Sequence, residues 1–248
     1  MYSRIKRIVN KHISKNFLVK NEVILRKMYA MFYSGRKFQC TVCDKKLRKF
    51  VVISENELMC PNCGSLSRTR RLKTILQDIF FNQSIKVLDF SPQRCLYRKL
   101  KKNRQIYYVA TDYAGEFIAD KRLNIVEIDE PDNVYDLIVC YHVLEHIKDD
   151  RKAISELFRI LKPGGKVLIQ TPFKEGEIYE NESIKTGADR RIHFGQEDHV
   201  RYYSVNGLCE RLEQAGFIAK PIKYQEKQPD FYGFRDETVI FAEKSETV

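Results

Sequence analysis

Residues 131–173 decide the fold. They begin Pro-Asp-Asn-Val-Tyr-Asp-Leu-Ile-Val-Cys-Tyr-His-Val-Leu-Glu-His-Ile and, after a charged stretch, end Leu-Lys-Pro-Gly-Gly-Lys-Val-Leu-Ile-Gln-Thr-Pro-Phe. This pattern predicts a buried strand at 135–140, a helix at about 149–161 and a second buried strand at 166–171. Apolar runs of this length that alternate with a helix are typical of parallel strands covered on both faces. Ligands of such sheets bind outside the carboxyl ends of the strands, so we expect a site near the loop after Cys140.

The same alternation of strands and helices extends over the chain from residue 85 onward. It predicts further helices at about 93–102 and 204–215, and the polar, aromatic segment 189–203 is expected to be a long loop. We therefore predict the α/β class, with a doubly wound, Rossmann-like sheet of seven strands in a domain that covers residues 67–248. The predicted strands lie at about 85–90, 106–111, 123–128, 135–140, 166–171, 217–224 and 237–243.

The positive charge is concentrated in the first third of the chain. The net formal charge of the 248 residues is +11, and residues 1–75 hold 18 Lys and Arg against 4 Asp and Glu. Such an excess forms either a solvated surface or a patch that attracts nucleic acid, an anionic lipid surface or an anionic substrate. No run approaches the ~18 apolar residues of a transmembrane segment, and no secretory signal is visible, so we expect a cytoplasmic protein.

Residues 1–35 are predicted to form a basic amphipathic helical segment. Ile5, Ile8 and Val9 recur at helical spacing with Lys and Arg between them, and a similar pattern runs from Val23 to Phe32. A basic amphipathic helix either packs on the protein's own core or lies on a membrane surface. Peripheral membrane contact through this segment is therefore one of the two expectations.

Two Cys-x-x-Cys pairs predict a metal-binding module at residues 36–66. Sixteen residues separate the pairs, and two such pairs at this spacing are typical of a structural Zn²⁺ site in a zinc ribbon. Four thiolates fill the coordination shell of the metal, so we expect no catalysis there. The alternatives are four buried cysteines or a redox pair. The predicted ligands are Cys40, Cys43, Cys60 and Cys63.

The motifs in combination resemble a known family. They are Cys-Pro-Asn-Cys-Gly-Ser followed by Arg68 and Arg70, Val-Leu-Asp-Phe-Ser-Pro, His-Val-Leu-Glu-His-Ile, Leu-Lys-Pro-Gly-Gly, and Phe194-Gly-Gln-Glu-Asp-His-Val-Arg-Tyr202. Together they resemble a zinc-ribbon-bearing bacterial subgroup of the class I S-adenosylmethionine-dependent methyltransferases, of the type 11 class. The resemblance covers residues 36–218. It implies the fold, S-adenosylmethionine as cofactor, and methyl transfer, but not the substrate.

The resemblance also implies a cofactor site at the ends of the first strands. Asp89 is the candidate partner for the ammonium group of the cofactor, and Asp112, 23 residues further on, is placed to accept from the ribose hydroxyls. Asn124 is the candidate partner of the adenine amino group, since its amide oxygen can accept a hydrogen bond. The loop after the first strand contains no glycine, unlike most of the family. The predicted cofactor-binding residues are Asp89, Phe90, Ser91, Asp112, Tyr113, Asn124, Ile125 and Tyr141.

Two histidines are candidate general bases. We predict that His142 lies beneath the methionine end of the cofactor and accepts a proton from a substrate hydroxyl, because histidine titrates near neutral pH. A purely structural role in its own loop is the alternative, and His199 is the rival base. The string His-x-x-Glu-His also occurs in zinc proteases, but a strand ends just before it, which argues against that use. The predicted substrate-binding residues are His193, Arg201 and Tyr202, for a small anionic or sugar-like acceptor.

Three functions remain open from the sequence. The leading prediction is O-methylation of a small molecule, such as a sugar or glycan precursor. The second is an RNA methyltransferase whose basic ribbon binds phosphates. The third is a non-catalytic zinc-ribbon protein with a degenerate nucleotide fold, which the glycine-free loop would favour.

Overall fold

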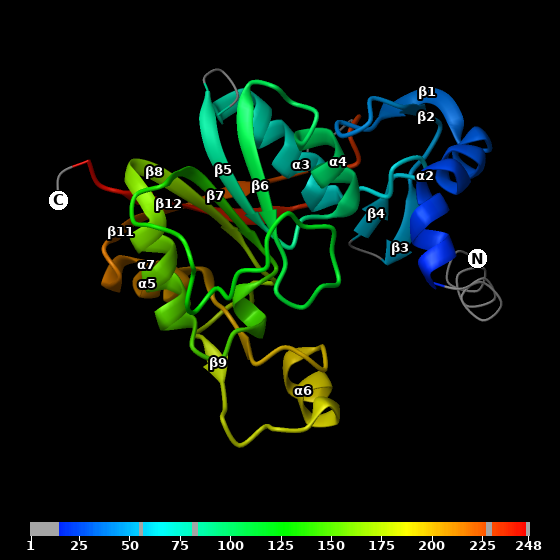
Figure 1. The fold of residues 1–248 in the computed structure, drawn as a ribbon. Coiled ribbons are helices and arrows are strands. Elements are labelled where there is room, and N and C mark those ends of the chain that lie inside the picture. The colour runs from blue at the N-terminus through cyan, green and yellow to red at the C-terminus, as the bar shows by residue number, and fades with distance from the viewer. Residues whose placement is uncertain (1–14, 55–56, 81–83, 227–229, 247–248) are drawn as a thin grey trace. The chain divides into compact units, whose positions relative to one another are not determined.

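A six-stranded, mostly parallel sheet forms the centre of the larger part of the protein (Figure 1). In the computed structural model, residues 15–54, 57–80, 84–226 and 230–246 are described. The strand order is β11-β12-β8-β7-β5-β6. Strand β5 pairs in parallel with β6 and β7, β7 pairs in parallel with β8, and β12 is antiparallel to β8. The strands are β5 (Ile85–Phe90), β6 (Ile106–Thr111), β7 (Tyr135–Tyr141), β8 (Leu161–Gln170), β11 (Phe217–Tyr224) and β12 (Glu237–Lys244).

The predicted fold class is confirmed, but the strand predicted at 123–128 is not a strand. The side-chain oxygen of Asn124 accepts a hydrogen bond from the backbone N–H of Val126 (3.3 Å), and its carbonyl accepts one from Glu127 (3.0 Å). Asn side chains compete in this way with sheet ladders and favour turns. Leu123, Ile125 and Ile128 are still buried in the core, so the apolar pattern predicted burial correctly and geometry wrongly.

Helices connect the parallel strands and cover the sheet. Helix α4 (Arg94–Leu100) follows β5, α5 (Asp150–Ile160) follows β7, and α7 (Val205–Gln214) precedes β11. The side chain of Asp149 caps α5 by accepting from the N–H of Lys152 (3.1 Å), as N-cap aspartates do. Figure 1 shows α5 and α7 side by side against the sheet.

The segment predicted as a loop at 189–203 contains regular structure. It holds most of helix α6 (Gly187–Phe194) and the short strand β10 (Arg201–Tyr202), which pairs with β9 (Tyr179–Glu180). Thr186 caps α6 by accepting from the N–H of Asp189, and Gly195 ends it with φ 78°. Both are ordinary helix-end signals. The loop expectation was therefore wrong for these residues.

Residues Met1–Asn82, Arg98–Lys102 and Gln225–Glu237 belong to a second compact unit. Its helix α2 (Lys15–Met31) agrees with the predicted helical segment, whose first 14 residues lie outside the described residues. Two antiparallel pairs follow, β1 (Ser34–Gln39) with β2 (Lys46–Leu47) and β3 (Val51–Ser54) with β4 (Glu57–Met59). Helix α3 (Ser67–Ile75) continues into a π-helical turn, Leu76–Phe80. None of the described helices is long and apolar enough to cross a membrane.

A buried arginine holds this unit together. The Arg70 side chain is 0% exposed and its guanidinium lies over the ring of Phe50, 4.1 Å from the centroid. It donates to the carbonyl oxygens of Tyr232 (2.7 Å), Ser65 (2.8 Å) and Gly233. Arginine suits this position because its planar fork of donors satisfies several carbonyls at once. A single side chain thus links the segment after the second cysteine pair to residues 232–233.

We expect Arg70→Met to lower the free energy of unfolding of this unit by about 3 kcal/mol or more, because several buried carbonyls lose their donor. The matched control is Arg68→Met. The Arg68 side chain is 32% exposed and pairs with Glu57 at 2.7 Å, an interaction worth about 1 kcal/mol or less. Urea unfolding of both variants measures the difference. Equal stability of the two variants would contradict the role assigned to Arg70.

Candidate functional site

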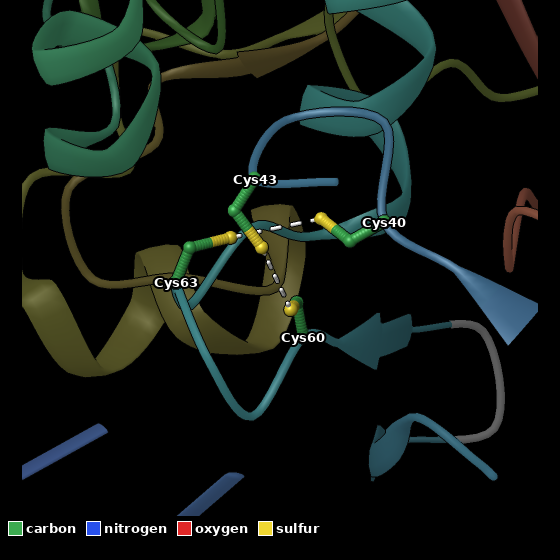
Figure 2. A group of neighbouring side chains, drawn as sticks. All are labelled: Cys40, Cys43, Cys60 and Cys63. Atoms are coloured by element: carbon green, nitrogen blue, oxygen red, sulfur yellow. Dashed lines mark hydrogen bonds between the residues drawn. The ribbon is translucent and has the colours of Figure 1, made fainter. Parts of the chain in front are cut away.

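Four cysteine sulfurs meet at one point in the smaller unit (Figure 2). Cys40 Sγ lies 3.7 Å from Cys63 Sγ, and Cys43 Sγ lies 3.8 Å from Cys60 Sγ. A tetrahedral metal with M–S bonds of about 2.3 Å has sulfur–sulfur edges of about 3.8 Å. The predicted ligands therefore have both the donor type and the spacing of a closed tetrahedral thiolate site.

The two Cys-x-x-Cys turns have the same backbone geometry. In each, the carbonyl of the first cysteine accepts from the N–H four residues later, at Asp44 (2.8 Å) and Gly64 (2.9 Å). The N–H of the first cysteine donates to the carbonyl five residues later in both turns. Asp44 and Gly64 both adopt positive φ, 60° and 82°. This repeated turn directs two sulfurs per pair toward a common centre.

The four thiols also perturb one another. Hydrogen bonds from the other three lower the pKa of Cys40, whereas hydrogen bonds to Cys40 raise the pKa of Cys43 and of Cys60. Four thiolates this close repel one another, so they cannot ionise together without a cation between them. The site fits a metal ion better than it fits four unligated thiols.

The second group of candidate residues lies at the carboxyl edge of the parallel sheet. Asp89, in β5, is 1% exposed and accepts a hydrogen bond from the hydroxyl of Tyr108 (2.7 Å). Burial raises the pKa of Asp89 to about 7, against the lowering effect of the Tyr108 hydrogen bond. Phe90, the last residue of β5, is also buried. A buried carboxyl group of this kind is suited to a cationic ligand.

Ser91 replaces the glycine expected after this strand. Its φ is 50°, the left-handed conformation that usually requires glycine. Its N–H donates to the carbonyl of Thr111 (2.7 Å), and its hydroxyl donates to Asp112 Oδ1 (2.8 Å). Asp112 Oδ2 accepts from the N–H groups of Glu116 (2.6 Å) and Phe117 (3.1 Å). Ser91 thus adopts at the strand end a backbone conformation that glycine adopts more readily.

The remaining residues that were predicted to contact the nucleoside differ in their exposure. Tyr113 is exposed, with the guanidinium of Arg122 5.3 Å from its ring centroid, whereas Ile125 is buried in the core. Asn124 uses its side-chain oxygen in the turn described above. Tyr141 ends β7 opposite Gln170 of β8 and is half-buried.

His142 follows β7 in a left-handed conformation, with φ 55°. Its N–H donates to the carbonyl of Gln170 (2.8 Å), and its Nδ1 lies 3.2 Å from Glu145 Oε1. Its Nε2 is buried and has no hydrogen-bond partner among the described residues. Gln170 Oε1 and Thr171 Oγ1 are likewise buried without a hydrogen-bond partner among the described residues. Buried polar atoms without partners are uncommon in folded proteins and point to a ligand.

Glu145 is the residue that the sequence analysis left without a role. It is 1% exposed and lies in the 3-10 turn Leu144–His146. Burial raises the pKa of Glu145, but the contact with His142 and the nearby His146 outweigh burial, so the pKa is lowered overall. Glu145 is therefore ionised at neutral pH. The sequence signal for Glu145 was its place in the polar loop after a buried strand, and for Gln170 and Thr171 it was the polar end of the next buried strand.

His199 is buried beside this turn. Its Nδ1 bonds the carbonyl of Phe194 (3.1 Å), and its ring meets that of His146 edge-on, 4.7 Å between centroids. Burial, and secondly the proximity of His146, lower the pKa of His199. His146 Nδ1 in turn lies 3.2 Å from Asp198 Oδ2.

Two of the predicted substrate-binding residues form hydrogen bonds within the protein. Arg201 is buried and donates to the carbonyl oxygens of Ile147 and Lys148 and to Glu180, so its guanidinium is used within the fold. His193 is exposed on α6, where its Nδ1 bonds the hydroxyl of Tyr179 (2.9 Å). Tyr202 is half-buried with Lys174 over its ring at 3.6 Å, and it faces His199 edge-on. Of these three described residues, Tyr202 alone makes a ring contact with His199, 6.4 Å between centroids.

A family model described as "Methyltransferase domain" matches residues 66–219, more than half of the chain. The chain belongs to this methyltransferase family. The match covers the whole edge of the sheet described above, from Asp89 to Tyr202. The class I S-adenosylmethionine-dependent methyltransferase predicted from the motifs is thereby confirmed as the family, with the Rossmann-like fold that it implies.

Relatives of known name agree with this domain. The chain is 34% identical over 94 residues to a probable S-adenosylmethionine-dependent methyltransferase of Mycolicibacterium smegmatis, covering 38% of this chain and 33% of the relative. It is 29% identical over 89 residues to a ubiquinone biosynthesis O-methyltransferase of Aeromonas salmonicida, covering 35% and 37%. The matches thus span about a third of the length of each of these curated relatives.

Solved structures show the same fold at low identity. A phosphoethanolamine N-methyltransferase 2 of Haemonchus contortus, in complex with S-adenosyl-L-methionine, has a TM-score of 0.52 and 15% identity, covering 71% of this chain and 52% of that chain. The [4+2]-cyclase SpnF has a TM-score of 0.50 and 15% identity, covering 72% and 82%. Because the second is named for a different reaction, the fold alone does not identify the chemistry.

The methyltransferase site fits S-adenosylmethionine on its own geometry. Asp89 offers a buried carboxyl group in β5, Ser91 has a left-handed backbone conformation, and its hydroxyl donates to Asp112 (2.8 Å). The unpartnered His142 Nε2, Gln170 Oε1 and Thr171 Oγ1 leave polar atoms for a ligand at the same edge.

We expect the affinity for S-adenosylhomocysteine, which carries the same ammonium group, to rise with pH. Because burial raises the pKa of Asp89 to about 7, its carboxyl is mostly protonated below pH 7 and ionised above it. The ionised form binds the ammonium, so the dissociation constant should be about eightfold lower at about pH 7.5 than at about pH 6. Calorimetric titration measures this change. In Asp89→Asn we expect weak binding without this pH dependence, and an equal slope in both proteins would refute the assignment.

Proposed function

We propose that the chain transfers a methyl group from S-adenosylmethionine to an oxygen atom of a small acceptor, such as a sugar or glycan precursor. The observation that carries the proposal is His142, whose Nε2 is buried without a partner while its Nδ1 is held by Glu145. The Aeromonas relative named as an O-methyltransferase supports an oxygen acceptor. The choice of a sugar or glycan precursor as acceptor follows from the family that the motifs resemble.

The cofactor residues would act as binding groups. Asp89 would hold the ammonium, Ser91 and Asp112 the ribose, and Tyr113 the adenine, with Phe90 and Tyr141 closing the strand ends. The predicted adenine contacts of Asn124 and Ile125 are not proposed again, because the Asn124 side-chain oxygen accepts from Val126 and Ile125 is buried in the core. S-adenosylmethionine supplies an electrophilic methyl group on a sulfonium. The contribution of the protein is to align the acceptor with that group and to exclude water, which are the main requirements of an in-line displacement.

His142 and Glu145 would together remove the acceptor proton. An ionised Glu145 next to Nδ1 favours the tautomer with the proton on Nδ1, which leaves the lone pair on Nε2. Nε2 would then be free to accept the hydroxyl proton of an acceptor aligned with the methyl group, which S-adenosylmethionine would supply with its sulfur as leaving group. Glu145 is a positioning residue in this scheme, since it acts through the imidazole. His199 remains the alternative base, but its Nδ1 is hydrogen-bonded to the carbonyl oxygen of Phe194.

In the smaller unit we propose structural Zn²⁺ on Cys40, Cys43, Cys60 and Cys63. The repeated turns and the sulfur spacing support zinc, and the four thiols require a reducing environment, which supports a cytoplasmic location.

Two observations weaken the support for the two alternative functions. The RNA hypothesis relied on the positive charge of the first third of the chain, but within that part Arg70 and Arg71 are buried and Arg68 pairs with Glu57. The non-catalytic reading relied on the missing glycine, and Ser91 adopts the glycine conformation. Exposed basic residues on and beside β1 and β2 still suit an anionic partner; they are Arg36, Lys37, Lys46, Arg48 and Lys49.

The His142 proposal is tested with a panel of small hydroxylated acceptors, by measuring S-adenosylhomocysteine release. With the best acceptor, His142→Gln should lower kcat by at least about 100-fold, while the affinity for S-adenosylhomocysteine stays within about twofold. Glu145→Gln should lower kcat less and change the pH profile. Lys152→Gln is the control, because Lys152 is an exposed residue of α5 with no assigned role in the site. Normal turnover by His142→Gln would remove the proposed base.

Helix α2 also supports peripheral contact with an anionic membrane. Its exposed side chains include Phe17, Ile24 and Met28, with Lys20 and Lys27 beside them. Apolar and basic side chains on one helix suit the lipid–water interface.

We expect the protein to sediment with vesicles that contain anionic lipid, and the paired change Ile24→Asp and Met28→Asp to reduce the bound fraction about tenfold. Ile192→Asp, a change at an exposed apolar residue of α6, should bind like the unchanged protein. No sedimentation with anionic vesicles, or equal binding by all variants, would rule this contact out.

A further inference from the structure

A second group of metal-ligand side chains lies in the methyltransferase domain, far in sequence from the cysteines. Glu145, His146 and His199 each direct one ligand atom so that these atoms all lie within 4.8 Å of one another. Two of the three belong to the turn after β7, and the third precedes β10. Nothing in the cofactor site or in the proposed proton transfer requires His146 and His199.

Hydrogen bonds to backbone carbonyls hold the turn after β7 next to the segment that contains His199. The N–H of Val200 donates to the carbonyl of Glu145 (2.9 Å), so residues 199 and 145 are neighbours by construction. Arg201 adds bonds to the carbonyl oxygens of Ile147 and Lys148 on the same turn. A fixed backbone on both sides is what a preorganised ligand set requires.

Both imidazole rings have their Nδ1 atoms engaged within the protein. The Nδ1 of His199 bonds the carbonyl of Phe194 (3.1 Å), and the Nδ1 of His146 lies 3.2 Å from the carboxylate of Asp198. Metal-bound histidines characteristically donate their other ring nitrogen to a backbone carbonyl or a carboxylate. Among the described residues no hydrogen bond uses the Nε2 of either ring, so both remain available as ligands.

Glu145 provides a buried carboxylate with spare capacity. Its Oε1 lies near His142, but its Oε2 is buried and accepts no hydrogen bond from the described residues. A buried carboxylate oxygen without a donor is costly, and a cation next to it removes the cost. One carboxylate can serve both neighbours, with Oε1 toward His142 and Oε2 toward the cation.

We propose that Glu145, His146 and His199 bind a divalent transition-metal ion at a site separate from the four cysteines. Two imidazole nitrogens and one carboxylate oxygen suit Zn²⁺, Mn²⁺, Co²⁺ or Fe²⁺, and three protein ligands leave coordination positions open. Bonds of about 2.0–2.2 Å require the ligand atoms to approach one another by about 1 Å, which side-chain rotation supplies. If the proposed O-methylation holds, an open position beside His142 would bind an oxygen of the acceptor.

The test is a Zn²⁺ titration of protein whose cysteine site already holds zinc, with total metal per chain determined by elemental analysis. The unchanged protein should take up a second equivalent at submillimolar Zn²⁺. His146→Asn and His199→Asn should bind that equivalent at least about tenfold more weakly, whereas His193→Asn, an exposed histidine outside the cluster, should bind it normally. Circular dichroism checks that each variant is folded.

Each outcome of the titration either supports or overturns the proposed metal site. A single equivalent in the unchanged protein overturns the proposal, and so does a second equivalent that persists in both cluster variants, because it would be adventitious surface binding. If His199→Asn does not fold, His146→Asn decides alone, since His146 is partly exposed. The titration contains no methyl donor or acceptor, so failure here leaves the proposed methyl transfer standing, and failure of methyl transfer leaves the metal site standing.

Discussion

Parallel pairing of β5, β7 and β8 is the constraint on which the site depends. The register sets Asp89 opposite Val139, Phe90 opposite Cys140, and Tyr141 opposite Gln170. All three strands therefore end at one edge, and Asp89, His142 and Gln170 all lie at or next to that edge although they are far apart in sequence. A shift of the register by one residue would turn every side chain to the opposite face and would separate the buried acid from the buried imidazole.

A partly buried network of charges holds the loops next to these strands. Asp150, the first residue of α5, accepts from the hydroxyl of Tyr203 and pairs with Arg211, and Glu180 pairs with both Arg201 (2.7 Å) and Arg211 (2.5 Å). Removing one partner from such a network leaves an uncompensated buried charge and is strongly destabilising. The network thus fixes β9 and β10, and with them the position of His199 next to Glu145.

The sequence predicted the parts of the fold whose signal is local. The apolar runs at 135–140 and 166–171 became β7 and the second half of β8, and the charged stretch between them became α5. The cysteine spacing likewise predicted the four converging sulfurs. The strand at 123–128 was wrong because burial and strand geometry give the same apolar alternation, and only the Asn124 turn distinguishes them. Helix α6 was missed, although Thr186 and Gly195 carried its end signals.

The site was less predictable, because it depends on contacts between distant residues. Arg201 reads as a surface cation in sequence, but folding buries it against the backbone of 147–148. His146 and His199 are more than fifty residues apart, so nothing in the sequence pairs them. Glu145 appeared only as part of a protease-like string, and its burial next to His142 gave it a chemical role.

The central claim is that the edge formed by Asp89, Ser91 and Asp112 holds an adenosyl group without a glycine-rich loop. A crystal structure of the protein grown with S-adenosylhomocysteine tests it most directly. The account predicts density for the nucleoside against Ser91, with the ammonium at Asp89, the ribose at Asp112 and the sulfur facing His142. An edge filled by the protein's own side chains, with no ligand density at millimolar S-adenosylhomocysteine, would contradict it.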